Sequence, residues 1–262
     1  MGLLSAVGAG QEPTLELAAT LYLPSPPAQI PVPGLIVGHG AGSRRARHDL
    51  FCREACQSGF AVLAFDFRGH GESGGEADGP LEEDVLAAAH FLRTHPAVDS
   101  SRLCYRGSSM GGFYGLKAAS RAGFAAMVLL CPASEDVMLD GIADCQKAEA
   151  DSERADTDDA TAGGGEAADP GGAAPRWDTP RLRSYFERQD SRLLAAQVDC
   201  PVLLVHARED EVVPFDHSVL LMEHLRTEKT LLALDGGTHT TAQHDPQVHR
   251  YSMDWLAAEL MH

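Results

Sequence analysis

A serine lies at the centre of the pentapeptide Gly107-Ser108-Ser109-Met110-Gly111, which matches the pattern G-x-S-x-G. The apolar run Leu103–Tyr105 precedes it and a helical pattern follows it, which is the context of a sharp turn from strand to helix. Such a turn lifts the central hydroxyl above a sheet edge. Side chains two positions away would collide there, and the two flanking glycines leave that space open. The pattern predicts Ser109 as a nucleophile, although it also arises by chance in loops rich in glycine and serine.

A serine hydroxyl is a weak nucleophile, so it needs a base, and the base needs an orienting acid. Two later apolar runs supply both at their ends. Asp210 follows Val202–His206, and His239 follows Thr230–Leu234. The carboxyl ends of parallel strands meet at one edge of a sheet. We therefore expect Ser109, Asp210 and His239 to converge, in the chain order Ser, Asp, His.

Each partner has a neighbour that could replace it. Glu209 is an alternative to Asp210 as the acid, and His244 is an alternative to His239 as the base. The glycine pair directly before His239 favours His239.

The same chemistry needs N–H donors for the oxyanion of a tetrahedral intermediate. The backbone N–H of Met110, next to the nucleophile, is one candidate. The second is expected in the glycine-rich loop at 38–42, after the apolar run Leu35–Val37. We favour the Ala41 N–H, with the Gly42 N–H as the alternative. A phosphate cradle is the alternative interpretation of this loop, but the lysine of a P-loop is absent from it.

Short apolar runs alternate with helix-length segments, which is typical of a mostly parallel sheet covered on both faces. The predicted strands are Leu15–Leu23, Leu35–Val37, Ala61–Phe65, Leu103–Tyr105, Ala126–Leu130, Val202–His206 and Thr230–Leu234. The predicted helices are Asp49–Gln57, Leu81–Arg93, Gly111–Arg121, Asp216–Leu225 and Asp245–Glu259.

One region interrupts this alternation. Residues 148–175 contain no aromatic residue and consist mostly of Ala, Gly, Asp, Glu, Ser, Thr and Pro. Such a composition buries too little apolar surface to offset the entropy of ordering the chain, so we expect this segment to be disordered. It lies within a region at 132–198 that we interpret as a cap or insertion, with some order returning at Trp177–Leu194. We expect a single domain over 1–262, because the strand pattern resumes after the insertion.

Composition excludes several functional classes. The 262 residues carry a net charge of −17, and seven acidic residues against one basic residue fall in 151–172. A surface of that sign repels phosphate backbones and anionic lipids, so we expect no nucleic-acid and no membrane partner. The N-terminus has neither the basic nor the apolar region of a signal peptide, which favours a cytoplasmic protein. The six cysteines are too few for a disulfide framework, and we interpret them as reduced thiols.

Taken together, the motifs resemble those of serine hydrolases of the α/β-hydrolase superfamily. The resemblance is to the branch with small carboxylesterases, serine aminopeptidase-like hydrolases and prolyl-oligopeptidase-like catalytic domains. It covers roughly residues 35–240 and rests on HGAG (39–42), DFRGHGES (66–73), GSSMGG (107–112), HAREDEVVP (206–214) and GGTH (236–239). It implies an α/β fold with a mostly parallel central sheet flanked by helices. By this resemblance Ser109 is the nucleophile, His239 the general base and acid, and Asp210 the orienting carboxylate, while the loop containing His70 braces the site.

Three features depart from the family pattern. Ala207 stands where glycine is usual, and the insertion replaces the cap that shapes the substrate pockets in relatives. Arg106 precedes the pentapeptide, where an apolar residue is more common. A buried arginine would need a carboxylate partner; otherwise we expect it to be exposed or to recognise an acidic substrate group.

The resemblance implies hydrolysis of a carboxylic ester through an acyl-enzyme, with a small-molecule ester as substrate and no metal or organic cofactor. A thioesterase or small peptidase with the same triad is the first alternative. A non-catalytic binding protein of this fold is a further alternative, but such proteins typically lose the nucleophile, the base or the glycines that this chain retains.

Overall fold

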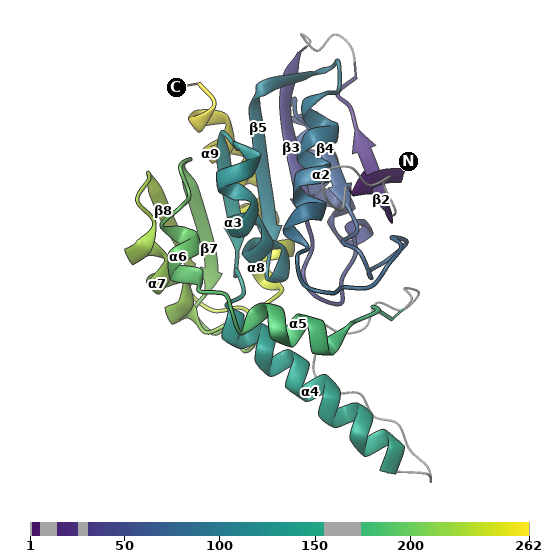
Figure 1. Cartoon of the computed structure of the whole chain (residues 1–262). Helices are drawn as coiled ribbons and strands as arrows, with labels where there is room; N and C mark the ends of the chain where they lie inside the picture. Colours follow the sequence, from purple (N-terminus) through teal and green to yellow (C-terminus); the bar gives the residue numbers. More distant parts are fainter. Residues whose placement is uncertain (1, 6–14, 26–30, 155–173, 262) are drawn as a thin grey trace.

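The computed structural model describes residues 2–5, 15–25, 31–154 and 174–261. Its centre is a sheet of eight strands in the order β1-β2-β4-β3-β5-β6-β7-β8 (Figure 1). The strands are β1 Gly2–Ser5, β2 Leu15–Tyr22, β3 Val32–Gly38, β4 Ala61–Phe65, β5 Val98–Ser108, β6 Ala126–Leu130, β7 Val202–Ala207 and β8 Lys229–Leu234. Along the part of the sheet ordered β4-β3-β5-β6-β7-β8, each strand pairs in parallel with the next. The strands β1 and β2 add an antiparallel edge beside β4. The predicted mostly parallel sheet is confirmed.

Helices cover both faces of this sheet. The short helix η1 (Arg45–His48) leads into α1 (Asp49–Gln57), which packs on one face with α8 (Thr241–His244) and α9 (Pro246–Glu259). The opposite face carries α2 (Glu82–Arg93), α3 (Met110–Ala122), α6 (Ser191–Ala195) and α7 (Phe215–His224).

Successive residues of a strand contribute to opposite cores. In β3, Ile36 packs with the α2 and α3 side, whereas Leu35 and Val37 pack with the α1 and α9 side. This double burial explains why the strands read as unbroken apolar runs in the sequence.

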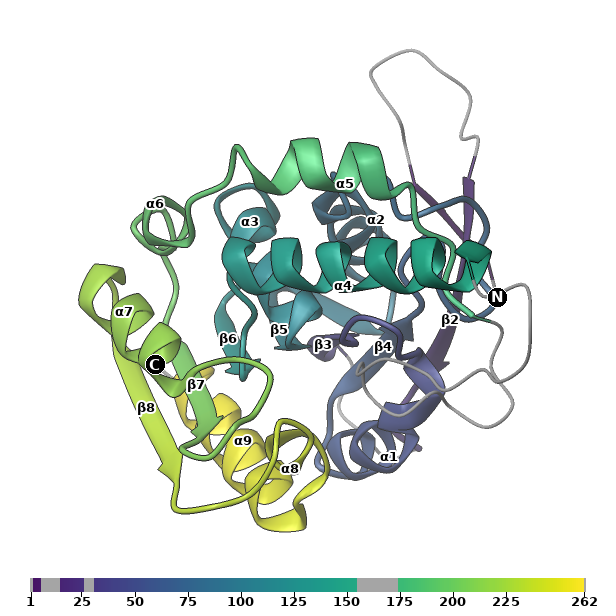
Figure 2. The same cartoon turned by 90° about the horizontal axis from the view of Figure 1, so that it is seen from below.

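Two further helices, α4 (Glu135–Arg154) and α5 (Thr179–Phe186), cross the edge of the sheet where the parallel strands end (Figures 1 and 2). Each has a side-chain cap. The Val137 N–H donates to the Ser134 hydroxyl at 3.1 Å, and the Arg181 N–H donates to the Asp178 carboxylate at 3.1 Å. Trp177 forms a bridge with Ala77, which ties the chain before α5 to the main domain.

The sequence pattern predicted neither α4 nor α5 as a helix, although α5 lies within Trp177–Leu194, where order was expected to return. Disorder was expected over 148–175. Residues 148–154 instead form the end of α4, which projects away from the body in Figure 1. Alanine and glutamate in this stretch favour a helix, so its low content of apolar residues does not prevent helix formation. Residues 155–173 lie outside the described residues. Within the described ranges, no helix combines the length and the apolar character needed to cross a membrane.

Candidate active site

Ser109 occupies a strained turn between β5 and α3. Its backbone angles are φ 49° and ψ −117°, and it is one of two described non-glycine residues with positive φ. A Cβ on Gly107 would lie 2.5 Å from the Gly111 carbonyl oxygen, and one on Gly111 would lie 2.6 Å from the Gly38 carbonyl oxygen. Both obstacles are backbone atoms that cannot rotate away. These contacts show why the turn requires glycine on both sides of the serine.

The end of β6 and the loop that follows it fix the backbone of Ser109 through two hydrogen bonds. The Ser109 N–H donates to the Leu130 carbonyl at 2.9 Å, and the Ala133 N–H donates to the Ser109 carbonyl at 3.1 Å. Because both backbone groups of Ser109 are hydrogen-bonded to this segment, the turn persists despite its unfavourable backbone angles.

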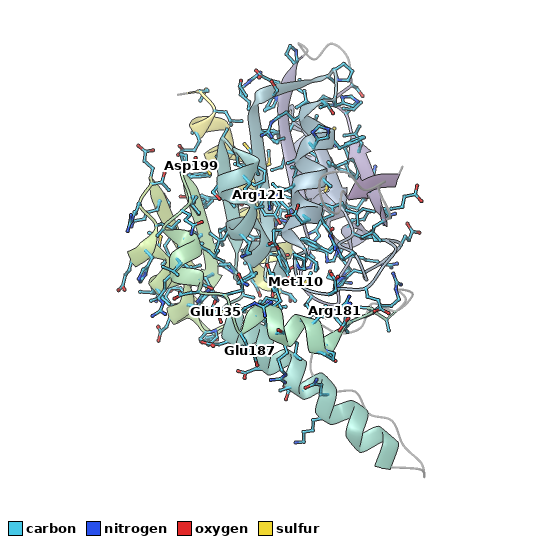
Figure 3. The ribbon with its side chains drawn as sticks, in the orientation of Figure 1. Met110, Arg121, Glu135, Arg181, Glu187 and Asp199 are labelled. Carbon is cyan, nitrogen blue, oxygen red and sulfur yellow. The ribbon has the colours of Figure 1, made fainter. Side chains whose placement is uncertain are left out.

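The two candidate oxyanion donors lie at the same edge of the sheet. Met110 is the first residue of α3, where backbone N–H groups have no partner within the helix. Figure 3 shows Met110 at the lower end of the sheet, on the side that α4 and α5 cross. Ala41 is half-buried in the loop after β3, and Gly42 is exposed with φ 71°. In the described part of the chain, neither the Met110 nor the Ala41 N–H donates to a backbone carbonyl.

His39 fixes the shape of this loop. Its Nε2 accepts a hydrogen bond from the Phe67 N–H at 3.0 Å, so the proton of the neutral ring sits on Nδ1, which donates to the Gly40 carbonyl at 2.7 Å. Complete burial lowers the pKa of His39 to about 4. A neutral imidazole therefore connects the loop to the chain after β4.

Asp210 and His239 form a hydrogen-bonded pair. The His239 Nδ1 lies 2.8 Å from the Asp210 Oδ2, and both side chains are buried. The other carboxylate oxygen, Oδ1, accepts from the Val212 N–H at 2.9 Å and the Val213 N–H at 2.8 Å. Burial raises the pKa of Asp210, but hydrogen bonds from His206 and His239 outweigh it and hold this pKa well below its ordinary value. The carboxylate is therefore charged and favours a proton on Nδ1 of His239.

The neighbouring alternatives lie elsewhere. Glu209 is exposed, whereas Glu211 accepts a hydrogen bond from the His239 N–H at 3.1 Å. His244, at the end of α8, stacks on His48 with ring centroids 6.2 Å apart. Between the described side chains of Ser109 and His239 no hydrogen bond is formed; catalytic contacts of this kind often close only when substrate binds.

A model of the alpha/beta hydrolase family matches residues 35–250 of the chain. The chain belongs to the alpha/beta hydrolase family. Its matched span contains the strained serine, both candidate oxyanion donors and the Asp210–His239 pair.

Two curated relatives match part of this chain. The quorum-quenching protein AidA of Acinetobacter baumannii is 31% identical over 124 residues, which are 45% of this chain and 41% of AidA. The alpha/beta hydrolase domain-containing protein 17C of Xenopus tropicalis is 26% identical over 179 residues, 68% of this chain and 46% of that protein. The chain thus spans less than half of the length of either relative.

Solved structures match it almost from end to end. Est1E from Butyrivibrio proteoclasticus with bound ferulic acid has a TM-score of 0.70 at 22% identity, over 95% of this chain and 97% of that one. The monoacylglycerol lipase of Paleococcus ferrophilus has a TM-score of 0.66 at 20% identity, over 93% and 99%. These similarities show a shared fold.

Two residues without a role in the predictions from sequence also lie against the Asp210 carboxylate. The His206 Nε2 lies 3.0 Å from the Val213 carbonyl and 3.3 Å from the Asp210 Oδ2, so it faces two acceptors and carries the proton. Its Nδ1 then accepts from the Ser218 hydroxyl at 2.7 Å. The signal for His206 in the sequence is a polar residue that ends an otherwise apolar strand.

The second is Cys131, directly after β6. It is buried, has φ 42°, and its Sγ, a carboxylate oxygen of Asp210 and a ring nitrogen of His239 lie within 4.8 Å of one another. Burial, followed by the charge of Asp210, raises the pKa of the Cys131 thiol, which keeps it protonated. The three side chains could ligate a metal by type and spacing, but a metal there would compete with the hydrogen bond between Asp210 and His239.

The loop that contains His70 has the structural features expected of a brace. His70 is buried, its Nδ1 donates to the Arg68 carbonyl at 3.1 Å, and its ring meets Trp177 edge-on at 4.6 Å. Burial, followed by the charge of His39, lowers the pKa of His70 to about 3. Arg68 in turn forms a buried ion pair with Asp84 at 2.6 Å.

Arg106 contradicts the expectation that a buried arginine has a carboxylate partner. It is 1% exposed, lies over the Phe51 ring at 3.9 Å and donates to the Gln243 carbonyl at 3.1 Å. Among the described residues no carboxylate pairs with it. An aromatic face and one carbonyl take the place of the expected ion pair.

Proposed function

We propose that the chain is a serine hydrolase that cleaves a small-molecule carboxylic ester through an acyl-enzyme intermediate. The observation that carries this proposal is the 2.8 Å hydrogen bond between His239 Nδ1 and Asp210, at the strand edge where Ser109 stands on a strained turn. Nucleophile, base and orienting acid are the three groups that acyl transfer requires.

In the proposed mechanism the Ser109 hydroxyl attacks the ester carbonyl while His239 Nε2 takes its proton. The charged Asp210 holds the other ring proton on Nδ1 and stabilises the imidazolium that forms. The Met110 and Ala41 N–H groups donate to the oxyanion of the tetrahedral intermediate. Collapse of the intermediate expels the alcohol, which receives the proton from His239. Water activated by the same histidine then releases the acid.

The first test is turnover of p-nitrophenyl esters of graded acyl length, combined with mass spectrometry after treatment with a fluorophosphonate probe. We expect the probe to label Ser109, and Ser109→Ala to lose nearly all turnover while its circular dichroism and melting temperature are retained. Ser252→Ala is the matched control, because it removes a buried serine hydroxyl in α9, where it donates to the Val248 carbonyl at 2.7 Å.

Other outcomes distinguish the alternatives. Labelling at Ser109 without ester turnover would support the nucleophile and redirect the assay to thioesters and peptides. Absence of both labelling and turnover would refute the proposal and favour a binding protein of this fold.

The same proposal includes three predictions about context. Residues 132–198, with α4 and α5, serve as a cap over the site. The reaction uses no metal or organic cofactor, and the net charge of −17 argues against nucleic acid and membrane surfaces as partners. A cytoplasmic location remains a prediction from the sequence.

A further inference from the structure

Behind the strained serine, on the face covered by α1, α8 and α9, lies a buried polar cluster that the proposed mechanism does not use. Its centre is Arg106 on β5, and its walls include Phe51 and the Gln243 carbonyl. The Gln243 carbonyl also accepts from the His249 Nε2 at 2.8 Å. His48, which ends η1, completes the cluster through its stacking on His244 and its electrostatic interaction with Arg106.

Several polar atoms of this cluster have no hydrogen-bond partner among the described residues. They are the Arg106 Nε, both ring nitrogens of His48, and the Ser108 hydroxyl, which lies on the same face two residues after Arg106. The three side chains are 1%, 2% and 1% exposed, respectively. Native proteins satisfy nearly all such deeply buried groups with protein, ordered water or ions, so these unpartnered atoms indicate a bound solvent molecule or ion.

The charge of the cluster indicates the kind of ligand. Burial lowers the pKa of Arg106 to about 10, which still leaves the guanidinium charged at neutral pH. Among the described residues no carboxylate compensates this charge, and the aromatic ring of Phe51 compensates it only in part. A buried uncompensated charge is strongly destabilising.

We propose that Arg106, His48 and Ser108 form a binding site for a small monovalent inorganic anion of the size of chloride. The Arg106 Nε–H, the single N–H of the neutral His48 ring and the Ser108 O–H supply donors, and the guanidinium supplies the opposite charge. A buried water satisfies the donors but leaves the charge, whereas an anion satisfies both. Sulfate or phosphate brings a second charge and more acceptors than these donors can match. The site stabilises the strand that carries Ser109 from behind and is independent of whether Ser109 is catalytic.

The first experiment measures thermal unfolding of the whole chain in sodium chloride and sodium bromide against sodium gluconate at constant ionic strength. We expect a saturable rise in melting temperature with either halide, of about 5 °C when the halide reaches about one hundred times its Kd. Arg106→Met should lose this response, as should His48→Phe. The matched control is Arg102→Met, which removes an arginine from the same strand that is 38% exposed and pairs with Asp99. Equal halide responses in the wild type and in Arg106→Met would overturn the proposal.

The second experiment needs no variant. Crystals of the wild type grown in sodium bromide should give an anomalous peak within hydrogen-bonding distance of the Arg106 Nε and His48. Density for an ordinary water at this position, with no bromide peak, would overturn the proposal and assign the cluster to buried solvent.

Discussion

Replacing Asp210 by asparagine tests the proposed acid with almost no change of shape. The Val212 and Val213 N–H groups both donate to Oδ1. They will select the amide oxygen of the substituted side chain for that position, because an NH2 group there would face two donors. The amide NH2 must then take the place of Oδ2, where it points at Nδ1 of His239 and loses the contact that Oδ2 makes with the protonated His206 Nε2.

This forced orientation reverses the proton on the histidine. His239 can accept from the amide only with a lone pair on Nδ1, so its ring proton moves to Nε2, the atom that must receive the proton of Ser109. We expect kcat to fall about 10⁴-fold, which corresponds to about 5 kcal/mol of transition-state stabilisation. The loss of charge-assisted hydrogen bonds should cost about 2 kcal/mol of folding free energy, less than the ~5–15 kcal/mol stability of an ordinary domain.

The assay is kcat and KM on the best p-nitrophenyl ester, with urea unfolding of the same preparations. Glu209→Gln is the matched control, because it makes the same chemical change in the exposed neighbour, and its kcat should stay within about twofold of wild type. An Asp210→Asn variant that is folded and retains more than a tenth of the wild-type kcat would refute the assigned acid. A large loss in Glu209→Gln instead would transfer the role to Glu209.

Three further results are expected. Gly111→Ala should lower stability and turnover, because the added Cβ would lie 2.6 Å from a backbone oxygen. Gly141→Ala has open space around it in α4 and should instead stabilise the helix by up to about 1 kcal/mol, and denaturant unfolding of both variants measures the two effects. His244→Gln should keep ester turnover close to wild type, and a loss as severe as that of His239→Gln would contradict the assignment of the base. The pKa of His39 is lowered from 6.5 to about 4, so the unfolded chain binds the proton of this histidine first as pH falls. The contribution of His39 to the free energy of unfolding is therefore complete above pH 6.5 and should decline by about 3 kcal/mol between pH 6.5 and about pH 4. Urea titrations that show no decline across this range would disprove it.

The parallel sheet was predictable because its signal is local. Apolar runs such as Ala61–Phe65 and Ala126–Leu130 coincide with β4 and β6 at both ends. The meeting of Asp210 with His239 followed from one general property, that parallel strands end at a common edge. The helix α4 was missed because alanine, glutamate and aspartate suit both an exposed helix and a disordered segment.

Contacts between distant segments could not be predicted in this way. Nothing in the sequence around Cys131 indicates that its thiol lies beside Asp210, because that contact depends on the pairing of β6 with β7. The prediction of a carboxylate partner for a buried Arg106 was wrong for a related reason. The general rule asks for a carboxylate, whereas the fold offers the Phe51 ring and a helix carbonyl that belong to segments far away in the chain.

The position of Arg106 also connects two parts of the proposed machinery. β5 ends in the turn that carries Ser109, and Gln243, whose carbonyl accepts from Arg106, lies in α8, directly after the loop that carries His239. On the opposite face of the same strand, the Tyr105 hydroxyl donates to the Gly111 carbonyl at 2.7 Å. Consecutive residues of β5 therefore hold the far side of the serine turn and the segment of the base. Because both links start from one rigid strand, the distance between nucleophile and base is set by the core behind the site, and a change at Arg106 should alter that distance without touching substrate.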